Sequence, residues 1–158
     1  MAANSLRATE ILETHVGYLL SRLGSLSAAR FEGMLAPFGI TRMHFGLLKI
    51  LDGAGPSSQN MLSNDLGMPP SRVVAFVDDL EEQGLVARER SEQDRRVNVI
   101  RLTSRGRAVL ARANKIAIKW EDELLGDLSA AERTHLIEML QRVAARHLRP
   151  ASAPGANR

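Results

Sequence analysis

The 158-residue sequence predicts a mostly helical chain with one small β-hairpin. Three observations lead to this fold class. Apolar residues recur at helical spacing over most of the chain, a glycine and two prolines separate one short helical stretch from the next, and a polar loop divides two strand-like runs. Together they predict a compact central region, residues 41–103, with long helices on either side.

The central region contains two short helices joined by a tight turn. Ser57 or Ser58 is suited to cap the first helix, which extends to Leu66. The sequence Gly67-Met68-Pro69-Pro70 then ends it, because glycine favours a helix C-terminus and proline at a first helical position costs no hydrogen bond. The second helix is expected from Pro70 to about Gln83.

The second helix has one apolar face and one exposed face. Its apolar residues follow helical spacing and are expected to be buried: Val73, Phe76, Val77 and Leu80. The exposed face carries Ser71, Arg72, Val74 and Ala75. Two helices in this layout, with small, polar and basic residues at the exposed start of the second, are typical of a helix-turn-helix that reads DNA.

A hairpin follows the two helices. Strands are expected at Val86–Arg90 and Val97–Leu102, with the polar tip Ser91–Arg96 between them. Thr103 is suited to cap the next helix. This order of elements predicts a winged helix-turn-helix.

The same stretch resembles the multiple-antibiotic-resistance regulator (MarR) family of bacterial transcription factors. The resemblance extends over roughly residues 12–148, with Phe38-Gly39-Ile40-Thr41 as an upstream match. Pro69 departs from the pattern, because members often have a capping Ser or Asp there. The residues that carry the resemblance are, in order, Leu80, Gly84-Leu85-Val86, Asp94 with Arg96, Leu102-Thr103 and Gly106.

Apolar stripes mark long helices at 8–35 and, in two pieces, at 104–148. Left in water, these stripes would expose large apolar areas, so we expect the helices to interlock in a homodimer, with Trp120 in its core. The resemblance also implies a twofold dimer. The alternative is a monomer in which these helices pack only on the central region. Residues 149–158 are expected to form a disordered tail.

Composition limits the function classes. The chain has no cysteine, which excludes disulfides, thiolate metal sites and thiol oxidation sensing. The net charge is only +3, but residues 88–112 hold eight arginines and three acidic residues, as expected of a nucleic-acid-binding surface. We found no targeting or transmembrane segment, no His pair at i, i+4, no cofactor fingerprint and no nucleophile–base arrangement. We therefore expect a cytoplasmic protein that is not an enzyme and holds no metal or cofactor.

The DNA-reading residues are expected at the start of the second helix. Ser71 is suited to a phosphate, and Arg72 either to a guanine edge or to a phosphate. Val74 and Ala75 are placed to touch thymine methyls. In the wing, the resemblance implies that Arg96 enters the minor groove and that Asp94 braces it. Arg95 would then contact a phosphate, and the alternative is an ordinary solvated run of charges.

The resemblance further implies a small, often phenolic or anionic, effector bound between the DNA-binding region and the dimerisation helices. Candidate ligand-binding residues are His15, Tyr18, Arg22, His44 and Asn114, each of which is equally suited to a structural role. The expected function is a dimeric regulator, a repressor, that binds a pseudo-palindromic double-stranded operator. The alternatives are a winged-helix protein-interaction module and a ligand-independent DNA-binding protein.

Overall fold

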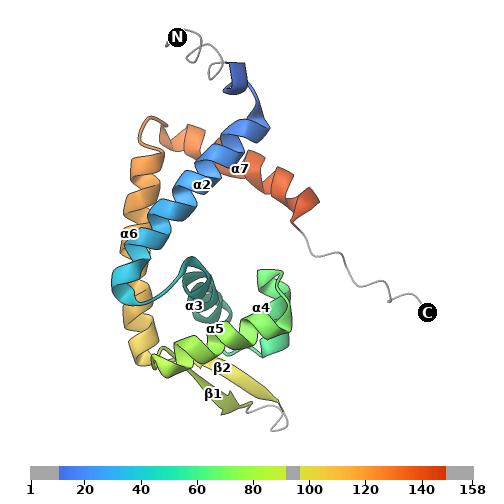
Figure 1. Cartoon of the computed structure of the whole chain (residues 1–158), viewed down its shortest axis with the longest axis vertical. Helices are drawn as coiled ribbons and strands as arrows, with labels where there is room; N and C mark the ends of the chain where they lie inside the picture. Colours follow the sequence, from blue (N-terminus) through green and yellow to red (C-terminus); the bar gives the residue numbers. More distant parts are fainter. Residues whose placement is uncertain (1–10, 92–96, 149–158) are drawn as a thin grey trace, which may run out of the picture. The chain divides into compact units, whose positions relative to one another are not determined.

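The structure is a computed structural model that describes residues 11–91 and 97–148 (Figure 1). The expected disordered tail, 149–158, lies outside the described residues. Two compact units make up the chain, residues 1–42 and residues 43–158. Helices dominate both units, and the only sheet in the described ranges is the two-stranded wing. The predicted fold class, mostly helical with a small β-wing, is confirmed.

The first unit is built on helix α2 (Val16–Leu35), followed by the short 3-10 helix η1 (Ala36–Phe38). One helix over residues 8–35 was expected; its start at residue 8 lies outside the described residues, and Ile11 and Leu12 are helical but are separated from α2 by a turn. His15 adopts an extended conformation (φ −99°, ψ 117°), so α2 begins only at Val16. Before it, the Thr14 hydroxyl donates to the carbonyl of Ile11 at 2.7 Å, a local bond that competes with continued helix.

The second unit contains the two short helices of the central region. Helix α3 (Arg42–Ala54), which starts at the last residue of the first unit, leads to α4 (Gln59–Leu66) and α5 (Pro70–Glu82). Ser58 caps α4 by accepting from the Met61 backbone N–H at 3.3 Å, as predicted. The core of this region is aliphatic and fully or almost fully buried, and includes Leu47, Leu48, Leu51, Leu62, Val73, Val77 and Leu80.

The wing consists of β1 (Val86–Arg90) and β2 (Asn98–Leu102), paired antiparallel from Val86 opposite Leu102 to Arg90 opposite Asn98. The second strand begins one residue later than expected. Ser57 adds a bridge to this sheet, because its N–H and carbonyl bond the carbonyl and N–H of Ile100 at 3.1 and 2.8 Å. Ser57, which the sequence suggested only as a possible helix cap, therefore fixes the start of α4 to the wing.

Two long helices follow the wing, α6 (Ser104–Leu124) and α7 (Ala130–His147). Thr103 caps α6 as predicted, and Ser129 with Glu132 forms a capping box at the start of α7. Asp122 and Arg133 join the two helices at their corner with an ion pair of 2.7 Å. Both long helices thus begin at side-chain caps.

Candidate nucleic-acid interface

The turn between α4 and α5 sets the direction of α5. Gly67 takes the left-handed conformation (φ 61°), and its N–H donates to the carbonyls of Ser63 and Asn64. The buried Ser63 hydroxyl donates to the Met68 carbonyl across the same turn. Pro69 then precedes α5, with Pro70 at the first helical position. This turn matches the helix-turn-helix layout predicted from the sequence.

No side chain in the described part of the chain caps the N-terminus of α5. Pro70 has no N–H, and the N–H groups of Arg72 and Val73 donate to the Pro69 carbonyl at 3.0 and 3.3 Å, so the first turn of α5 offers another partner the Ser71 N–H and the positive end of the helix dipole. Ser71, Arg72 and Ala75 are exposed there, and Val74 is half-buried. Phosphates are well suited to such a helix N-terminus.

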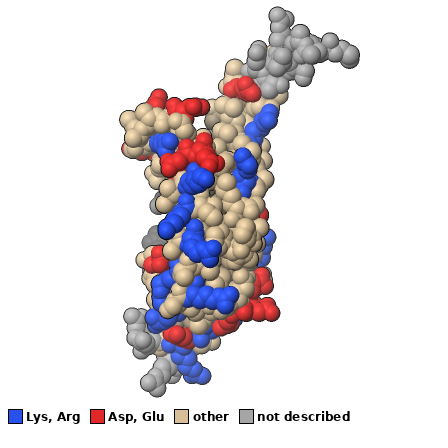
Figure 2. All heavy atoms as spheres, turned by 90° about the vertical axis from the view of Figure 1, so that its left-hand side faces the viewer, with Lys and Arg blue, Asp and Glu red and all other residues tan. Residues whose placement is uncertain are grey.

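Exposed basic side chains continue along α6, beyond the wing. Figure 2 views the molecule from the side on which α6 lies in Figure 1, and Lys and Arg side chains (blue) gather on this face. Those of α6 are all exposed: Arg105, Arg107, Arg112, Lys115 and Lys119. The basic clustering in the sequence therefore corresponds to a solvent-facing surface.

The wing tip carries the other DNA-reading residues expected from the sequence, Asp94, Arg95 and Arg96. All three lie outside the described residues. Below the tip, Glu89 and Arg101 form an ion pair of 2.7 Å between the two strands. The roles of the tip residues stay predictions.

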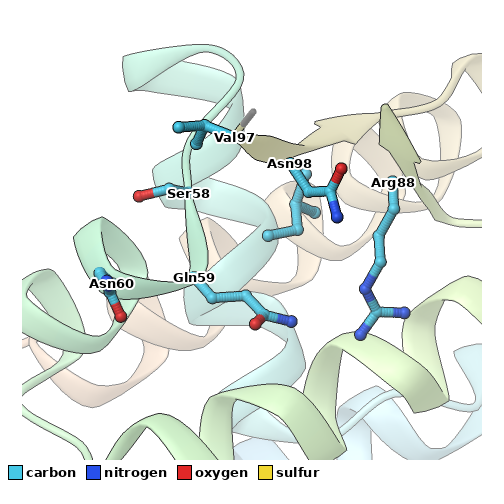
Figure 3. Close-up of a pocket in the computed structure, with 7 residues that line it drawn as sticks. Ser58, Gln59, Asn60, Arg88, Val97 and Asn98 are labelled. Atoms are coloured by element: carbon cyan, nitrogen blue, oxygen red, sulfur yellow. The ribbon is translucent and has the colours of Figure 1, made fainter. Parts of the chain in front are cut away.

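A hollow of about 310 Å³ lies between the start of α4 and the wing (Figure 3). The sequence analysis did not identify it, because it depends on the bridge at Ser57 that brings α4 to the sheet. Its lining is half polar and half apolar by area and comprises Ser58, Gln59, Asn60, Arg88, Val97, Asn98 and Ile100. In the sequence, the only indication of a polar hollow here is the pair of adjacent amide side chains, Gln59 and Asn60, directly after a helix cap.

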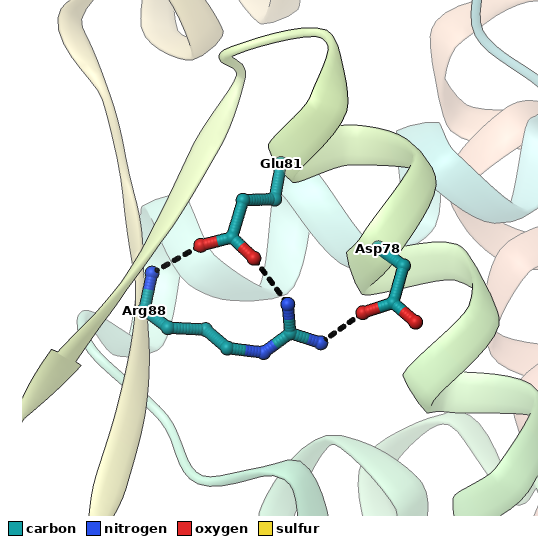
Figure 4. A network of polar contacts seen from close by, with 3 residues as sticks. All are labelled: Asp78, Glu81 and Arg88. Atoms are coloured by element: carbon teal, nitrogen blue, oxygen red, sulfur yellow. Dashed lines mark hydrogen bonds and ion pairs between the residues drawn. The ribbon is translucent and has the colours of Figure 1, made fainter.

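Arg88 of β1 binds the far end of α5 (Figure 4). Its guanidinium forms ion pairs with Asp78 and Glu81, and its backbone N–H donates to the other Glu81 oxygen at 3.0 Å. Partial burial of Arg88 lowers its pKa, but the two carboxylates outweigh that effect, so the pKa of Arg88 is raised above its ordinary value. The acidic end of α5 is thus attached to the wing.

His44 of α3 contacts α5 from another side. It is buried, its ring meets that of Phe76 edge-on with centroids 5.3 Å apart, and its Nε2 lies 3.6 Å from an Asp79 oxygen. The sequence analysis proposed His44 as a ligand-binding or a structural residue. These contacts favour the structural role, and ligand binding by His44 stays a prediction.

The other candidate ligand-binding residues are divided between the two units. In the first unit, Arg22 donates to the Tyr18 hydroxyl at 3.2 Å and lies 5.8 Å from the centre of its ring. This hydrogen bond raises the pKa of Arg22. His15 is exposed before α2, and in the second unit Asn114 is half-buried on α6. The structure therefore pairs Tyr18 with Arg22, while a shared ligand pocket stays a prediction.

Trp120 was expected in the core of a dimer. It is buried already in the single chain, with 9% of its surface exposed. Among the described residues, no three His, Asp or Glu side chains are grouped so that they would hold a metal ion. Within residues 11–91 and 97–148, no helix is long and apolar enough to cross a membrane.

Comparison with known proteins supports this picture. The family model of the MarR family matches residues 38–97. The uncharacterized HTH-type transcriptional regulator YdgJ of Bacillus subtilis (strain 168) is 30% identical over 131 residues, which cover 83% of this chain and 78% of YdgJ. The similarity therefore extends well beyond the helix-turn-helix.

Two solved structures show the same fold. The transcriptional repressor CouR bound to a 23-mer DNA duplex is 38% identical, with a TM-score of 0.75, over 84% of this chain and 94% of that one. CouR from Rhodococcus jostii RHA1 bound to p-coumaroyl-CoA is 25% identical, with a TM-score of 0.76, over 93% and 98% of the two chains. The resemblance noted in the sequence is thereby confirmed, and the chain belongs to the MarR family of winged helix-turn-helix transcription regulators.

Proposed function

We propose that this regulator is a dimeric, sequence-specific repressor that a small aromatic or anionic ligand releases from its operator. The observation that carries the DNA-binding part is the exposed first turn of α5, where Ser71 and Arg72 stand at the positive end of the helix dipole and no side chain of the described residues caps the helix. The acidic residues of α5 lie at its other end, where Arg88 engages two of them. Charge therefore favours docking of α5 by its N-terminus into the major groove.

The contacts that we assign follow from this docking. Arg72 would fork onto a guanine edge, Ser71 would bind a phosphate, and Val74 and Ala75 would meet thymine methyls. Asp94, Arg95 and Arg96 would serve the wing in the minor groove, as the family resemblance implies. The DNA complex of CouR, which is 38% identical to this chain, supports the proposal.

Exposed apolar side chains support the dimer. They lie on α2 and on α7, at positions where a lone soluble chain would expose polar residues. On α7 they adjoin a shallow apolar hollow bordered by Leu128, Leu136 and Met139. The exposed apolar residues of the two helices are Val16, Leu19, Leu20, Leu23, Leu26, Ile137, Met139, Leu140 and Val143. Burying each aliphatic side chain would contribute about 1.5–3 kcal/mol at full burial.

The ligand part of the proposal is supported by a relative. CouR from Rhodococcus jostii RHA1 holds p-coumaroyl-CoA, a ligand that joins an aromatic acyl group to several anionic phosphates. For this chain we propose an effector of the same chemical type, an aromatic acid or its CoA thioester. Tyr18 and Arg22, already paired on α2, offer an aromatic ring and a cation to such a ligand.

Fluorescence anisotropy tests the DNA and ligand parts together. A labelled duplex from the intergenic DNA beside the gene is compared with a shuffled duplex of equal length, at several salt concentrations. We expect tighter binding of the intergenic duplex by a factor of roughly 10³ or more. Aromatic acids and their CoA thioesters should then release it. Equal affinity for the two duplexes would refute sequence-specific binding, and release by none of the ligands would favour a ligand-independent DNA-binding protein.

The dimer has a separate test. Deleting Ala130–Arg158 removes α7 and should leave a monomeric or aggregated product that no longer binds the intergenic duplex. Light scattering gives the mass in solution, and circular dichroism reports the remaining helix. A soluble, folded dimer without this segment would contradict the proposed architecture.

A further inference from the structure

The far end of the recognition helix α5 carries four carboxylates: Asp78, Asp79, Glu81 and Glu82. Four negative charges on a DNA-binding element repel phosphate and so lower its affinity for DNA. Their presence is therefore expected to serve another purpose. Three of the four have a named partner on another element. Asp78 and Glu81 meet Arg88 of β1, and Asp79 lies beside His44 of α3. Asp78 and Glu81 therefore attach α5 to the wing.

Arg88 makes the most extensive of these attachments. One guanidinium nitrogen, Nη1, donates to Glu81, and the other, Nη2, donates to Asp78 (Figure 4). The Arg88 backbone N–H adds a bond of 3.0 Å to the second oxygen of Glu81. A single strand residue thus holds two carboxylates that are one helical turn apart. The planar fork of arginine is suited to this arrangement, and the ammonium group of lysine is not.

Because of the position of Arg88 in the chain, its bonds restrict the angle between α5 and the wing. Three residues, from Gln83 to Leu85, connect the end of α5 to the start of β1, and Gly84 turns the corner with φ 69°. Arg88 is the third residue of β1, so its bonds to α5 close a ring around that corner. Since β1 is paired with β2 along its length, an attachment at Arg88 orients the whole hairpin.

We propose that Arg88 is a positioning residue for DNA recognition, which fixes the angle between α5 and the wing without touching DNA itself. The proposal rests on the function proposed above, in which α5 reads the major groove and the wing reads the minor groove. With the angle fixed before binding, both elements meet their grooves together. Without Arg88, the hairpin would have to be oriented during binding, which reduces affinity for the operator.

Binding measurements compare Arg88→Met with Arg101→Met. The control, Arg101→Met, removes an equal charge from the same hairpin and breaks an ion pair with Glu89 of the adjacent strand. Arg88→Met should weaken operator binding roughly 2- to 30-fold, the range found for residues that act through their neighbours. Non-specific affinity and the salt slope should stay as in the wild type. A salt slope lower by about one per protomer would overturn the proposal, because Arg88 would then be a phosphate contact.

Two further variants keep the test decisive. Asp78→Asn with Glu81→Gln removes the attachment from the helix side. Because this double variant also loses two negative charges, which raises its affinity for any DNA, its operator affinity is compared with its own affinity for random DNA, and this ratio should fall as it does in Arg88→Met. Arg88→Lys keeps the charge but not the fork, so it should recover less than half of the loss in Arg88→Met on a logarithmic scale. Full recovery by lysine, or a wild-type ratio in the double variant, would overturn the role of the fork.

A measurement without DNA separates this inference from the proposed function. Because the chain has no cysteine, Glu82→Cys and Val97→Cys create two unique sites for spin labels, one at the end of α5 and one beside the wing. Electron paramagnetic resonance then gives the distribution of distances between the two spin labels. Labelled protein is diluted with unlabelled chains, so that labels on different protomers do not contribute. We expect this distribution to broaden in Arg88→Met and to stay narrow in Arg101→Met. An unchanged width in Arg88→Met would refute the positioning role, whether or not the wild type discriminates between DNA sequences.

Discussion

Substitution of Gly106 by alanine should destabilise the protein far more than any other Gly→Ala change in its helices. Gly106 lies in the first turn of α6, packed against the corner between α5 and β1. A Cβ at this position would lie 2.0 Å from the Leu85 carbonyl oxygen and 2.8 Å from Leu102 Cδ1. A relaxed contact between carbon and oxygen is about 3.3–3.6 Å, so the helix start must move by about 1.3 Å or more.

That movement would break a dense set of hydrogen bonds. The Thr103 hydroxyl, which has one proton to donate, lies 2.8 and 3.0 Å from the carbonyl oxygens of Gly84 and Leu85, and it accepts from the Gly106 N–H at 2.9 Å. The Thr103 N–H also donates to Leu85 at 3.1 Å. Losing two or three such bonds costs about 0.5–1.5 kcal/mol each. Overpacking adds about 1–3 kcal/mol, whereas the better helix propensity of alanine returns about 1 kcal/mol.

We therefore expect a loss of about 3 kcal/mol in the free energy of unfolding, measured by urea denaturation. The corresponding fall in Tm is about 6–12 °C for a chain of this size. Gly53→Ala in α3 is the matched control, because nothing lies within 4 Å of its added Cβ. It should be neutral or stabilising by up to about 1 kcal/mol. Protein concentration is held constant, since dimerisation would shift the midpoint. A Gly106→Ala variant within 1 kcal/mol of the wild type would refute the reasoning.

Three further predictions concern the DNA contacts and α7. Arg72→Ala should reduce the difference between operator and random DNA by about 1–3 kcal/mol per contact, and equal losses for both DNAs would make Arg72 a phosphate contact. At the wing tip, Arg96→Ala should lower the salt slope by about one to two per dimer, whereas Asp94→Ala should weaken operator binding only. Tighter operator binding by Asp94→Ala would show that it does not brace Arg96. Ser129→Ala should cost about 1 kcal/mol in thermal unfolding at neutral pH. Because hydrogen bonds from Ser129 lower the pKa of Glu132, this cap is present above the ordinary glutamate pKa and is lost as pH falls through the lowered one. An equal cost of Ser129→Ala at pH 3 would contradict that linkage.

The fold was largely predictable because its helix boundaries are encoded locally. Ser58, Thr103 and Ser129 each cap the helix that follows them, and the sequence alone identifies all three. Two features were not predictable. The extended conformation of His15 interrupts an otherwise continuous apolar stripe, and the bridge from Ser57 to Ile100 joins residues 43 positions apart. Neither feature changes the spacing of apolar residues in the sequence, because one is the conformation of a single residue and the other is a tertiary contact.

For the candidate site, the sequence proposes residues but not the contacts that connect them. Arginine clustering and the small, polar start of α5 indicate a candidate DNA-binding surface, whose roles stay predictions. The sequence does not reveal what the acidic end of α5 contacts. Its ion pairs with Arg88 and its approach to His44 need the tertiary structure, because Glu81 and Arg88 lie on different elements and His44 is 35 residues from Asp79.

The recognition helix therefore divides its work along its length. Its first turn exposes Ser71 and Arg72 to a partner, and nothing in the described fold depends on those two side chains. Its last turns carry Asp78 and Glu81, which orient the helix against the wing. Because the two sets of residues are separate, the first turn is free to change and recognise a different DNA sequence without loosening the helix. A change in the last turns would have a wider effect, because it would alter the orientation of α5 and so move all of its proposed base-reading residues at once. In the proposed mechanism, sequence preference is thus adjustable at the N-terminus of α5, while the angle between α5 and the wing is set at its C-terminus.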